Sequence, residues 1–115
     1  MEIKIYQIIT DKDTSIVAFE SYDRMLRDQG SFKSEIYGEV FEGEVERATD
    51  LERIFQLFNW VEPDFMPCGY YGHSLSVSDV VGIKNPQTNA WSYHYCDVFG
   101  FKKIEFDEEA AERIF

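Results

Sequence analysis

The pattern of apolar and polar positions predicts a chain that begins with a strand followed by a helix. Residues 2–9 alternate in a way that is typical of a strand with one well-buried face. Residues 19–29 repeat apolar side chains at helical spacing, with Ser21 or the residues just before it as a cap and Gly30 as a stop.

Residues 36–45 predict a second strand whose apolar side chains fall on both parities. This pattern favours either a central strand covered on both faces or a bulge that switches the register. Three acids, Glu42, Glu44 and Glu46, then share one parity, so we expect that part of the strand to face solvent.

A second helix is predicted from a capping box at residues 49–52. Thr49 is expected to accept a hydrogen bond from an N–H of the first turn, and Glu52 to bind the backbone N–H of Thr49 in return. An apolar stripe at helical spacing follows, and Asn59 or Trp60 ends the helix.

The remaining chain predicts a strand at 80–83, a hairpin-type loop at 84–89 and a return strand at 91–99. A final strand at 101–106 and a short acidic helix at 107–115 complete the expected elements. Strands and helices in this order imply an α+β fold with a mainly antiparallel sheet and two to three helices.

Length and composition restrict the class of protein. With 115 residues, the chain is long enough for one hydrophobic core, so residues 1–115 are expected to form a single domain. Aromatic residues make up 17% of the chain, which excludes an acidic disordered tail. The formal net charge of −11 argues against direct binding of nucleic acid or of an anionic membrane.

Targeting and redox signals point to the cytoplasm. No apolar run approaches the roughly 20 residues that a membrane span needs. The N-terminus lacks the cationic start and apolar stretch of a signal peptide. Two cysteines are too few for a disulfide framework, so we expect a reducing compartment. Separately, no cofactor is expected.

Two segments of the C-terminal half carry a resemblance to a known family. Residues 72–81, GHSLSVSDVV, and residues 93–101, YHYCDVFGF, resemble the YodL-like domain family. Ile5-Tyr6-Gln7 and the helix at 51–59 fit the same pattern, so the resemblance covers nearly the whole chain. It implies a small module of phages, conjugative elements and their hosts, often fused into large polyvalent proteins that are thought to protect incoming DNA from host defence. It implies no reaction and no catalytic residues.

Cysteine and histidine raise two further hypotheses. The residues that could supply zinc ligands are Cys68, His73, His94 and Cys96. Their spacing is not that of a standard zinc finger, and we expect no metal. An enzyme would need one of the cysteines as nucleophile beside a histidine and Asp79 or Asp97. The sequence contains neither a nucleophile elbow nor a Gly-rich phosphate loop, so we expect no enzyme.

The carboxylates are the most unusual feature of the composition. One acidic region comprises Glu39, Glu42, Glu44 and Glu46, and the other comprises Asp107, Glu108, Glu109 and Glu112. Alternate residues of a strand lie about 6.5–7 Å apart, a spacing comparable with that of phosphates along a nucleic-acid strand. These acids are expected either to occupy a nucleic-acid-binding groove of a partner protein or simply to form a solvated, solubilising surface.

Three other residues complete the candidate partner-binding set. Asp79 either presents its carboxylate to a partner beside the serines of the SLSVSDVV segment, or accepts backbone N–H bonds in a turn. Tyr70 and Tyr71 either anchor an interface or fill the core.

The expected function is inhibition of a host protein by a phage or mobile-element accessory protein. The expected partner is a nucleic-acid-binding defence enzyme, such as a CRISPR effector or a restriction enzyme, blocked by an acidic surface that mimics DNA. The alternative is a general protein-interaction or regulatory module whose acidity only aids solubility.

Overall fold

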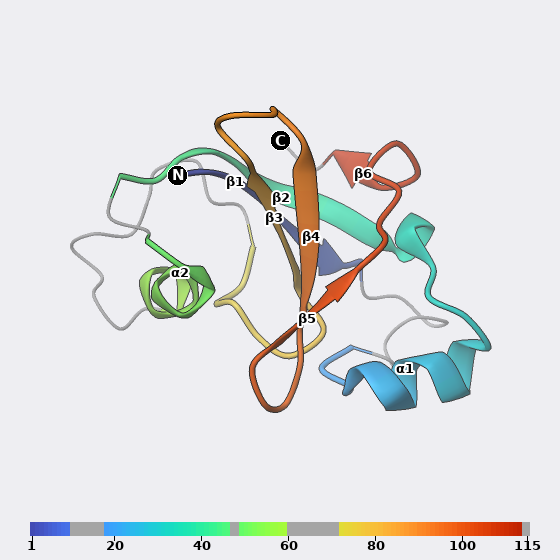
Figure 1. The fold of residues 1–115 in the computed structure, drawn as a ribbon. Coiled ribbons are helices and arrows are strands. Elements are labelled where there is room, and N and C mark those ends of the chain that lie inside the picture. The colour runs from blue at the N-terminus through green and yellow to red at the C-terminus, as the bar shows by residue number, and fades with distance from the viewer. Residues whose placement is uncertain (10–17, 47–48, 60–71, 114–115) are drawn as a thin grey trace.

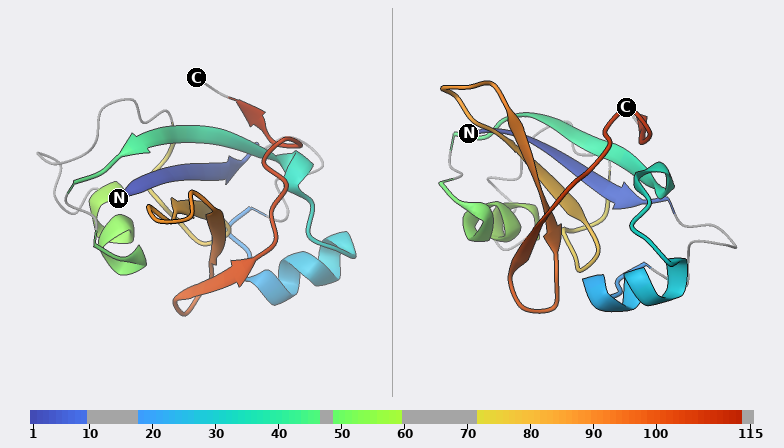
Figure 2. Two further views of the ribbon diagram at one scale, coloured as in Figure 1. Left: turned by 45° about the horizontal axis from the view of Figure 1, so that its top comes forward. Right: turned by 45° about the vertical axis from the view of Figure 1, so that its right-hand side comes forward.

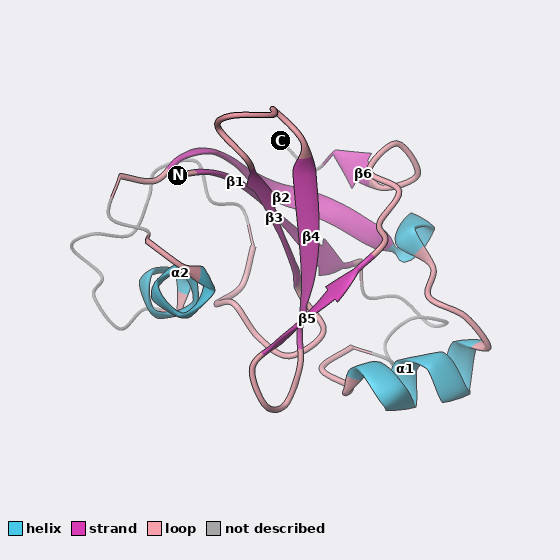
Figure 3. Ribbon diagram, viewed as in Figure 1, coloured by secondary structure: helices cyan, strands magenta, loops and turns pink. Residues whose placement is uncertain are grey.

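The computed structural model describes residues 1–9, 18–46, 49–59 and 72–113. These residues form a twisted six-stranded sheet in the order β5-β4-β3-β1-β2-β6, with one helix against each face (Figure 1, Figure 2 and Figure 3). In chain order the elements are β1 (Glu2–Ile8), α1 (Tyr22–Gln29), a 3₁₀ turn (Ser34–Ile36), β2 (Tyr37–Glu44), α2 (Leu51–Phe58), β3 (Val80–Lys84), β4 (Trp91–Cys96), β5 (Phe101–Ile104) and β6 (Glu112–Arg113). No helix in the described part of the chain has the length and apolar character needed to cross a membrane.

The sheet has the expected antiparallel character. Strand β1 lies at its centre and pairs antiparallel with both β2 and β3, and the chain continues antiparallel through β4 and β5. Only β6 is parallel, to β2. The prediction of an α+β fold with a mainly antiparallel sheet is therefore confirmed, with two α-helices among the described residues.

The acidic helix predicted at 107–115 is wrong as far as the structure describes that segment. Residues 107–111 form turns, and the backbone of Glu112 and Arg113 pairs with Gly38 and Glu39 of β2. A segment of nine residues is too short to be a stable helix without packing. Here the open edge of β2 offers backbone hydrogen bonds instead, and Ala111 packs against the core.

A β-bulge in β2 explains why its apolar residues fall on both parities. Ile5 lies opposite Phe41, but Tyr6 lies opposite Glu39, so Val40 is the extra residue. Both Val40 and Phe41 consequently belong to the core beneath α2. The register switch that the sequence left open is thus a bulge, in a strand whose residues 37–41 are all buried.

Helix α2 covers one face of the sheet through Ile54, Leu57 and Phe58, which are fully buried against Ile3 and Ile5 of β1. Its cap differs by one residue from the prediction. Asp50, and not Thr49, is the N-cap: its side chain accepts a hydrogen bond from the Arg53 backbone N–H at 2.8 Å. The helix begins at Leu51, so the carboxylate that immediately precedes it is the one within reach of the first turn.

Helix α1 covers the opposite face, where the core is largely aromatic. Its predicted cap and stop are confirmed: Ser21 accepts from the Arg24 N–H, and Gly30 adopts the left-handed conformation with φ +78°. Met25 packs against a group of buried tyrosines from the sheet, Tyr6, Tyr37, Tyr93 and Tyr95.

The position of the α2 cap leads to a test with a control in the neighbouring residue. Replacing Asp50 with Ala removes the acceptor of the Arg53 N–H and is expected to lower the free energy of unfolding by about 1 kcal/mol. Thr49→Ala is expected to change it by less than about 0.5 kcal/mol, as for an ordinary surface substitution. Urea unfolding of the two variants measures both values. A larger loss of unfolding free energy for Thr49→Ala would contradict Asp50 as the N-cap and support the capping box predicted from the sequence.

Candidate functional site

Glu42 and Glu44 of the first acidic segment share one face of the sheet with Glu108 of the second. Glu42 lies opposite Lys4, and Glu44 lies opposite Glu2, in the β1–β2 pairing. The Lys4 Nζ donates to Glu108 Oε2 at 2.8 Å, so the acidic C-terminal segment crosses the sheet on this same side. We call this surface the acidic face and define it by Glu2, Lys4, Glu42, Glu44, Lys84 and Glu108.

Glu108 is the residue that fixes the C-terminal segment on the sheet. Besides Lys4, its Oε2 accepts from the Tyr93 hydroxyl at 2.7 Å and from the Tyr6 hydroxyl at 3.5 Å. The hydrogen bonds from Lys4 and Tyr93 hold the pKa of Glu108 below its ordinary value. Burial raises the pKa of both tyrosines, and the negative charges of Glu39 and Glu108 raise it further, so each hydroxyl keeps the proton that it donates.

Lys4 lies at the centre of these contacts. Its side chain is largely buried, and its Nζ lies 4.5 Å from the centre of the Trp91 ring as well as in contact with Glu108. A cation that leaves water needs a counter-charge or an aromatic face, and Lys4 has both. Sequence patterning missed these contacts, because the residues come from β1, β4 and the turn before β6 and share no local signal.

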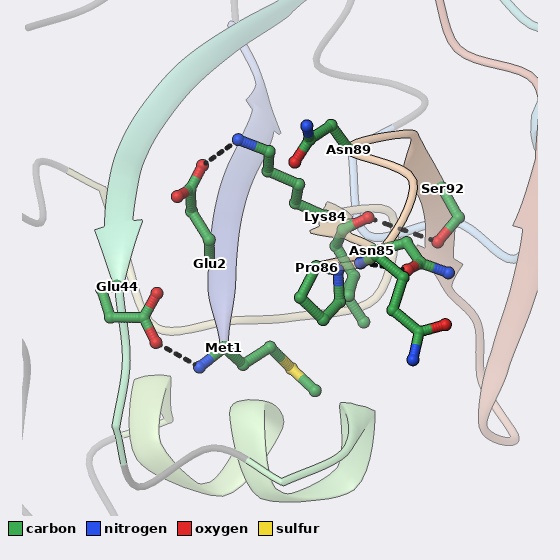
Figure 4. A pocket seen from close by; sticks show the side chains of 10 residues that line it. Met1, Glu2, Glu44, Lys84, Asn85, Pro86, Asn89 and Ser92 are labelled. Atoms are coloured by element: carbon green, nitrogen blue, oxygen red, sulfur yellow. Dashed lines mark hydrogen bonds and ion pairs between the residues drawn. The ribbon is translucent and has the colours of Figure 1, made fainter.

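Some of the negative charge on the acidic face is offset by ion pairs. The N-terminal amino group of Met1 lies 2.5 Å from Glu44 Oε1, and Lys84 Nζ lies 3.4 Å from Glu2 Oε2. Both pairs line a surface cleft of about 790 Å³ between β1, the end of β2 and the β3–β4 hairpin (Figure 4). The cleft wall is therefore a mixture of charges. Glu42 and Glu46, two residues before and after Glu44, have exposed side chains.

The remaining predicted site residues divide into accessible and inaccessible ones. Asp107, Glu109 and Glu112 are exposed. Glu39 is only 8% exposed and Asp79 only 1%, so neither carboxylate is part of the exposed acidic surface. The bulge accounts for Glu39, because it places this residue opposite Tyr6 on the covered part of the sheet. Tyr70 and Tyr71 lie outside the described residues.

Asp79 connects a loop to the centre of the sheet. Its Oδ2 accepts from the Ser76 backbone N–H at 2.7 Å and from Gln7 Nε2 at 3.1 Å. Gln7 Nε2 also donates to the His73 carbonyl at 2.8 Å, and its Oε1 accepts from the His73 N–H at 3.1 Å. These bonds agree with the interpretation of Asp79 as a turn-forming residue that sets up β3, and burial raises its pKa well above the ordinary value.

Among the described residues, Cys96 and the two histidines take part in packing and hydrogen bonding. Cys96 is buried, and burial raises the pKa of its thiol to about 12, which keeps it protonated at neutral pH. His94 Nε2 lies 3.0 Å from Ser92 Oγ, and burial lowers its pKa. His73 stacks beside Phe19, with ring centres 5.4 Å apart. Over residues 1–9, 18–46, 49–59 and 72–113, no three His, Cys, Asp or Glu side chains form a group that could hold a metal, and Cys68 lies outside these ranges.

The fold and these contacts define a small α+β domain with an acidic face built across β1, β2 and the C-terminal segment. The model of the YodL-like domain family matches residues 2–106. The chain therefore belongs to the YodL-like domain family, and the resemblance seen in its sequence is confirmed. No curated protein and no solved structure matches the chain.

The contacts of Glu108 predict a pH-dependent contribution to stability. Because its pKa is lower in the folded chain than the ordinary value of 4.5, Glu108 stabilises the fold above that pH. The contribution is lost as the pH falls through the lowered pKa. Glu108→Gln is thus expected to be less stable than the wild type at pH 7, with a difference that shrinks below pH 4.5.

Urea unfolding over a pH series measures this difference. Glu109→Gln is the matched control, because it removes the same charge from the next residue, whose side chain is exposed. Equal pH profiles for the two variants would contradict the role given to the Glu108 contacts.

The Asp79 contacts predict a difference between two substitutions at one position. Asp79→Ala leaves the buried Ser76 N–H and the Gln7 amide without their acceptor and is expected to cost about 1–3 kcal/mol or more. Asp79→Asn keeps one oxygen acceptor at the same place and is expected to cost less. Thermal unfolding of both variants checks the order, and a larger loss for Asn would show that the charge, rather than the acceptor, stabilises the turn.

Proposed function

We propose that this domain is a protein-binding module of a phage or another mobile element that inhibits a host defence enzyme. Its acidic face would cover a surface with which that enzyme binds nucleic acid. The proposal is supported above all by one observation: acids that are far apart in sequence, Glu42 and Glu44 of β2 and Glu108, lie on the side of the sheet from which Lys4 projects, and Lys4 contacts Glu108.

The strand geometry suits such mimicry. Glu42 and Glu44 are alternate residues of β2, and side chains at such positions project to one side at about 6.5–7 Å intervals. Glu46 follows the strand and is also exposed. A row of carboxylates on a rigid sheet could take the place of successive phosphates, and it would meet lysine and arginine side chains without the freedom of a disordered acidic tail.

Charge also determines which class of partner is suitable. A net charge of −11 repels nucleic acid and attracts a basic protein surface. Complementary charge accelerates encounter, and the effect weakens as salt increases. An inhibitor that competes with DNA or RNA benefits from this attraction and from the faster encounter, because it binds the same positive surface as the nucleic acid that it displaces.

A second candidate function is a general interaction module in which acidity serves solubility alone. Two observations favour it: ion pairs offset the charges of Glu2, Glu44 and Glu108, and several large apolar side chains are exposed away from the acidic face. Binding through that apolar surface would be insensitive to salt. The two candidates therefore differ in a measurable property.

Charge reversal on the acidic face tests the first candidate. The variant Glu42→Lys, Glu44→Lys, Glu46→Lys is expected to lose the host partner that the wild type captures at low salt. The reason is that repulsion replaces attraction at the contact. The measurement is affinity capture from host lysate at low and high salt, with mass spectrometry of the eluate and competition of the captured protein by duplex DNA.

The matched control carries the same change in charge on α1 and on the 3₁₀ turn that follows it. Its substitutions, Asp23→Lys, Asp28→Lys and Glu35→Lys, replace three exposed acids. This control is expected to retain the partner, and urea unfolding establishes that both variants fold. If the two variants captured equal amounts of the partner, or if capture did not depend on salt or on competing DNA, the acidic-face mechanism would be contradicted and the second candidate favoured.

A further inference from the structure

Large apolar side chains gather at the end of the molecule where β4 meets β5. Of the described residues, Phe19, Val98 and Phe99 are the exposed large hydrophobics, with 58%, 56% and 94% of their surfaces accessible. Val98 and Phe99 form the tip of the β4–β5 loop, which is the lowest part of the ribbon in Figure 1. A sheet domain of this size has enough core to bury such residues, so their exposure at one end is informative.

The Phe19 N–H donates to Ser78 Oγ at 2.9 Å, and the Ser78 N–H donates to the carbonyl of Cys96 at the end of β4, so Phe19 lies near this same end with its ring beside that of His73. The segment that leads into α1 is joined to the end of β4 at two points. The Tyr22 N–H donates to Asp97 Oδ1 at 3.3 Å, and the Tyr95 hydroxyl donates to the Glu20 carbonyl at 2.7 Å. The Asp97 carboxylate also accepts from the Val98 N–H at 2.8 Å, which holds the base of the loop. The exposed side chains thus stand on a fixed backbone.

A groove runs from this tip to the start of α2. It has a volume of about 750 Å³, and its apolar lining includes Leu51, Phe55 and Phe101. The rings of Phe55 and Phe101 lie edge to face, with centres 6.5 Å apart. Its acidic lining consists of Asp50, Glu52 and Asp97, and no basic side chain is among the described residues that line it.

We propose that this groove binds a linear segment of a partner protein that carries a large apolar side chain flanked by lysine or arginine. The apolar lining and the Val98–Phe99 tip would bury the apolar side chain, and the three carboxylates would pair with the flanking cations. Charge complementarity identifies this occupant. A second copy of the chain would bring the same three acids, and a net charge of −11, against each other.

The groove is independent of the acidic face. Strand β4 begins beside the cleft at Met1 and Glu44, and runs away from it to end at Cys96 in the groove. The two surfaces consequently lie toward opposite ends of the central strands (Figure 1). The acidic face could fail as a binding site while the groove binds, and the reverse also holds.

Synthetic peptides test this proposal directly. The probes are twelve-residue peptides with a central Phe or Leu between lysines and arginines, compared with peptides that have a central Ala and with peptides flanked by glutamates. The wild-type chain is expected to bind only the basic apolar set. In ¹H–¹⁵N NMR spectra the shifts are expected at residues 50–55 and 96–101.

Three variants separate the contributions. Val98→Ser with Phe99→Ser alters exposed side chains only and is expected to weaken binding at least tenfold. Glu52→Lys is expected to weaken binding of the basic peptides and to improve binding of the glutamate-flanked set with a central Phe or Leu. The Glu42→Lys, Glu44→Lys, Glu46→Lys variant is expected to bind the peptides as the wild type does, so that failure of the groove and failure of the proposed inhibition are distinguishable.

Several outcomes would overturn the proposal. One is the absence of binding by every peptide at millimolar concentration, and another is binding whose shifts map to a different surface. A third is a dimer in sedimentation velocity that Val98→Ser with Phe99→Ser converts to monomer, because the groove would then bind a second copy of the chain. Equal binding of basic and glutamate-flanked peptides would remove the role given to the carboxylates.

Discussion

The contact between Lys4 and Glu108 determines how this small domain presents its charge. Lys4 projects from the central strand into a largely buried position beside Trp91, where an ammonium group without a counter-charge would be costly. Glu108 supplies that charge from the C-terminal segment, and the Tyr93 hydroxyl adds a short hydrogen bond to the same oxygen. The segment therefore crosses the sheet at this point, and its backbone goes on to pair with the edge of β2. The Tyr6 hydroxyl, also from β1, donates to the same oxygen at 3.5 Å, so two side chains of the central strand hold Glu108 on this face of the sheet.

Local signals in the sequence were sufficient for most of the fold. The strand predicted at residues 2–9, the Ser21 cap and the Gly30 stop are each confirmed, because each depends on residues next to one another in the chain, although residues 5–8 of the strand are buried on both faces and not on one. The two parities of β2 indicated either burial on both faces or a bulge, and the structure has both: a bulge at Val40 in a strand whose residues 37–41 are all buried. The α2 cap was wrong by one position, because Thr49 and Asp50 are both good caps and the start of the helix decides which is used.

The candidate site could be predicted less well from the sequence than the fold, because burial and ion pairing depend on contacts between distant segments. Glu39 and Asp79 look like surface acids when the neighbouring residues alone are considered. The bulge and the Gln7 side chain place both of them inside. The prediction of a C-terminal helix was wrong for the same reason, because neighbouring residues in the sequence do not reveal the open edge of β2 with which this segment pairs. Conversely, the meeting of the two acidic segments at Lys4 could only come from the three-dimensional register.

The carboxylates of this chain thus serve at least three purposes that composition cannot separate. Some fix the structure, as Asp50 and Asp79 do, and some pair with cations, as Glu108 and Glu44 do. A third group, defined only by its exposure, includes Glu42 and Glu46. The central claim is that the last group contacts the partner. Carbodiimide labelling of carboxylates, read by mass spectrometry in the free domain and in its complex with the captured host protein, tests this claim most directly. Selective protection of Glu42 and Glu46, with unchanged labelling of Asp23, Asp28 and Glu35, is the expected result, and equal labelling of Glu42 and Glu46 in the free and bound domain would contradict it.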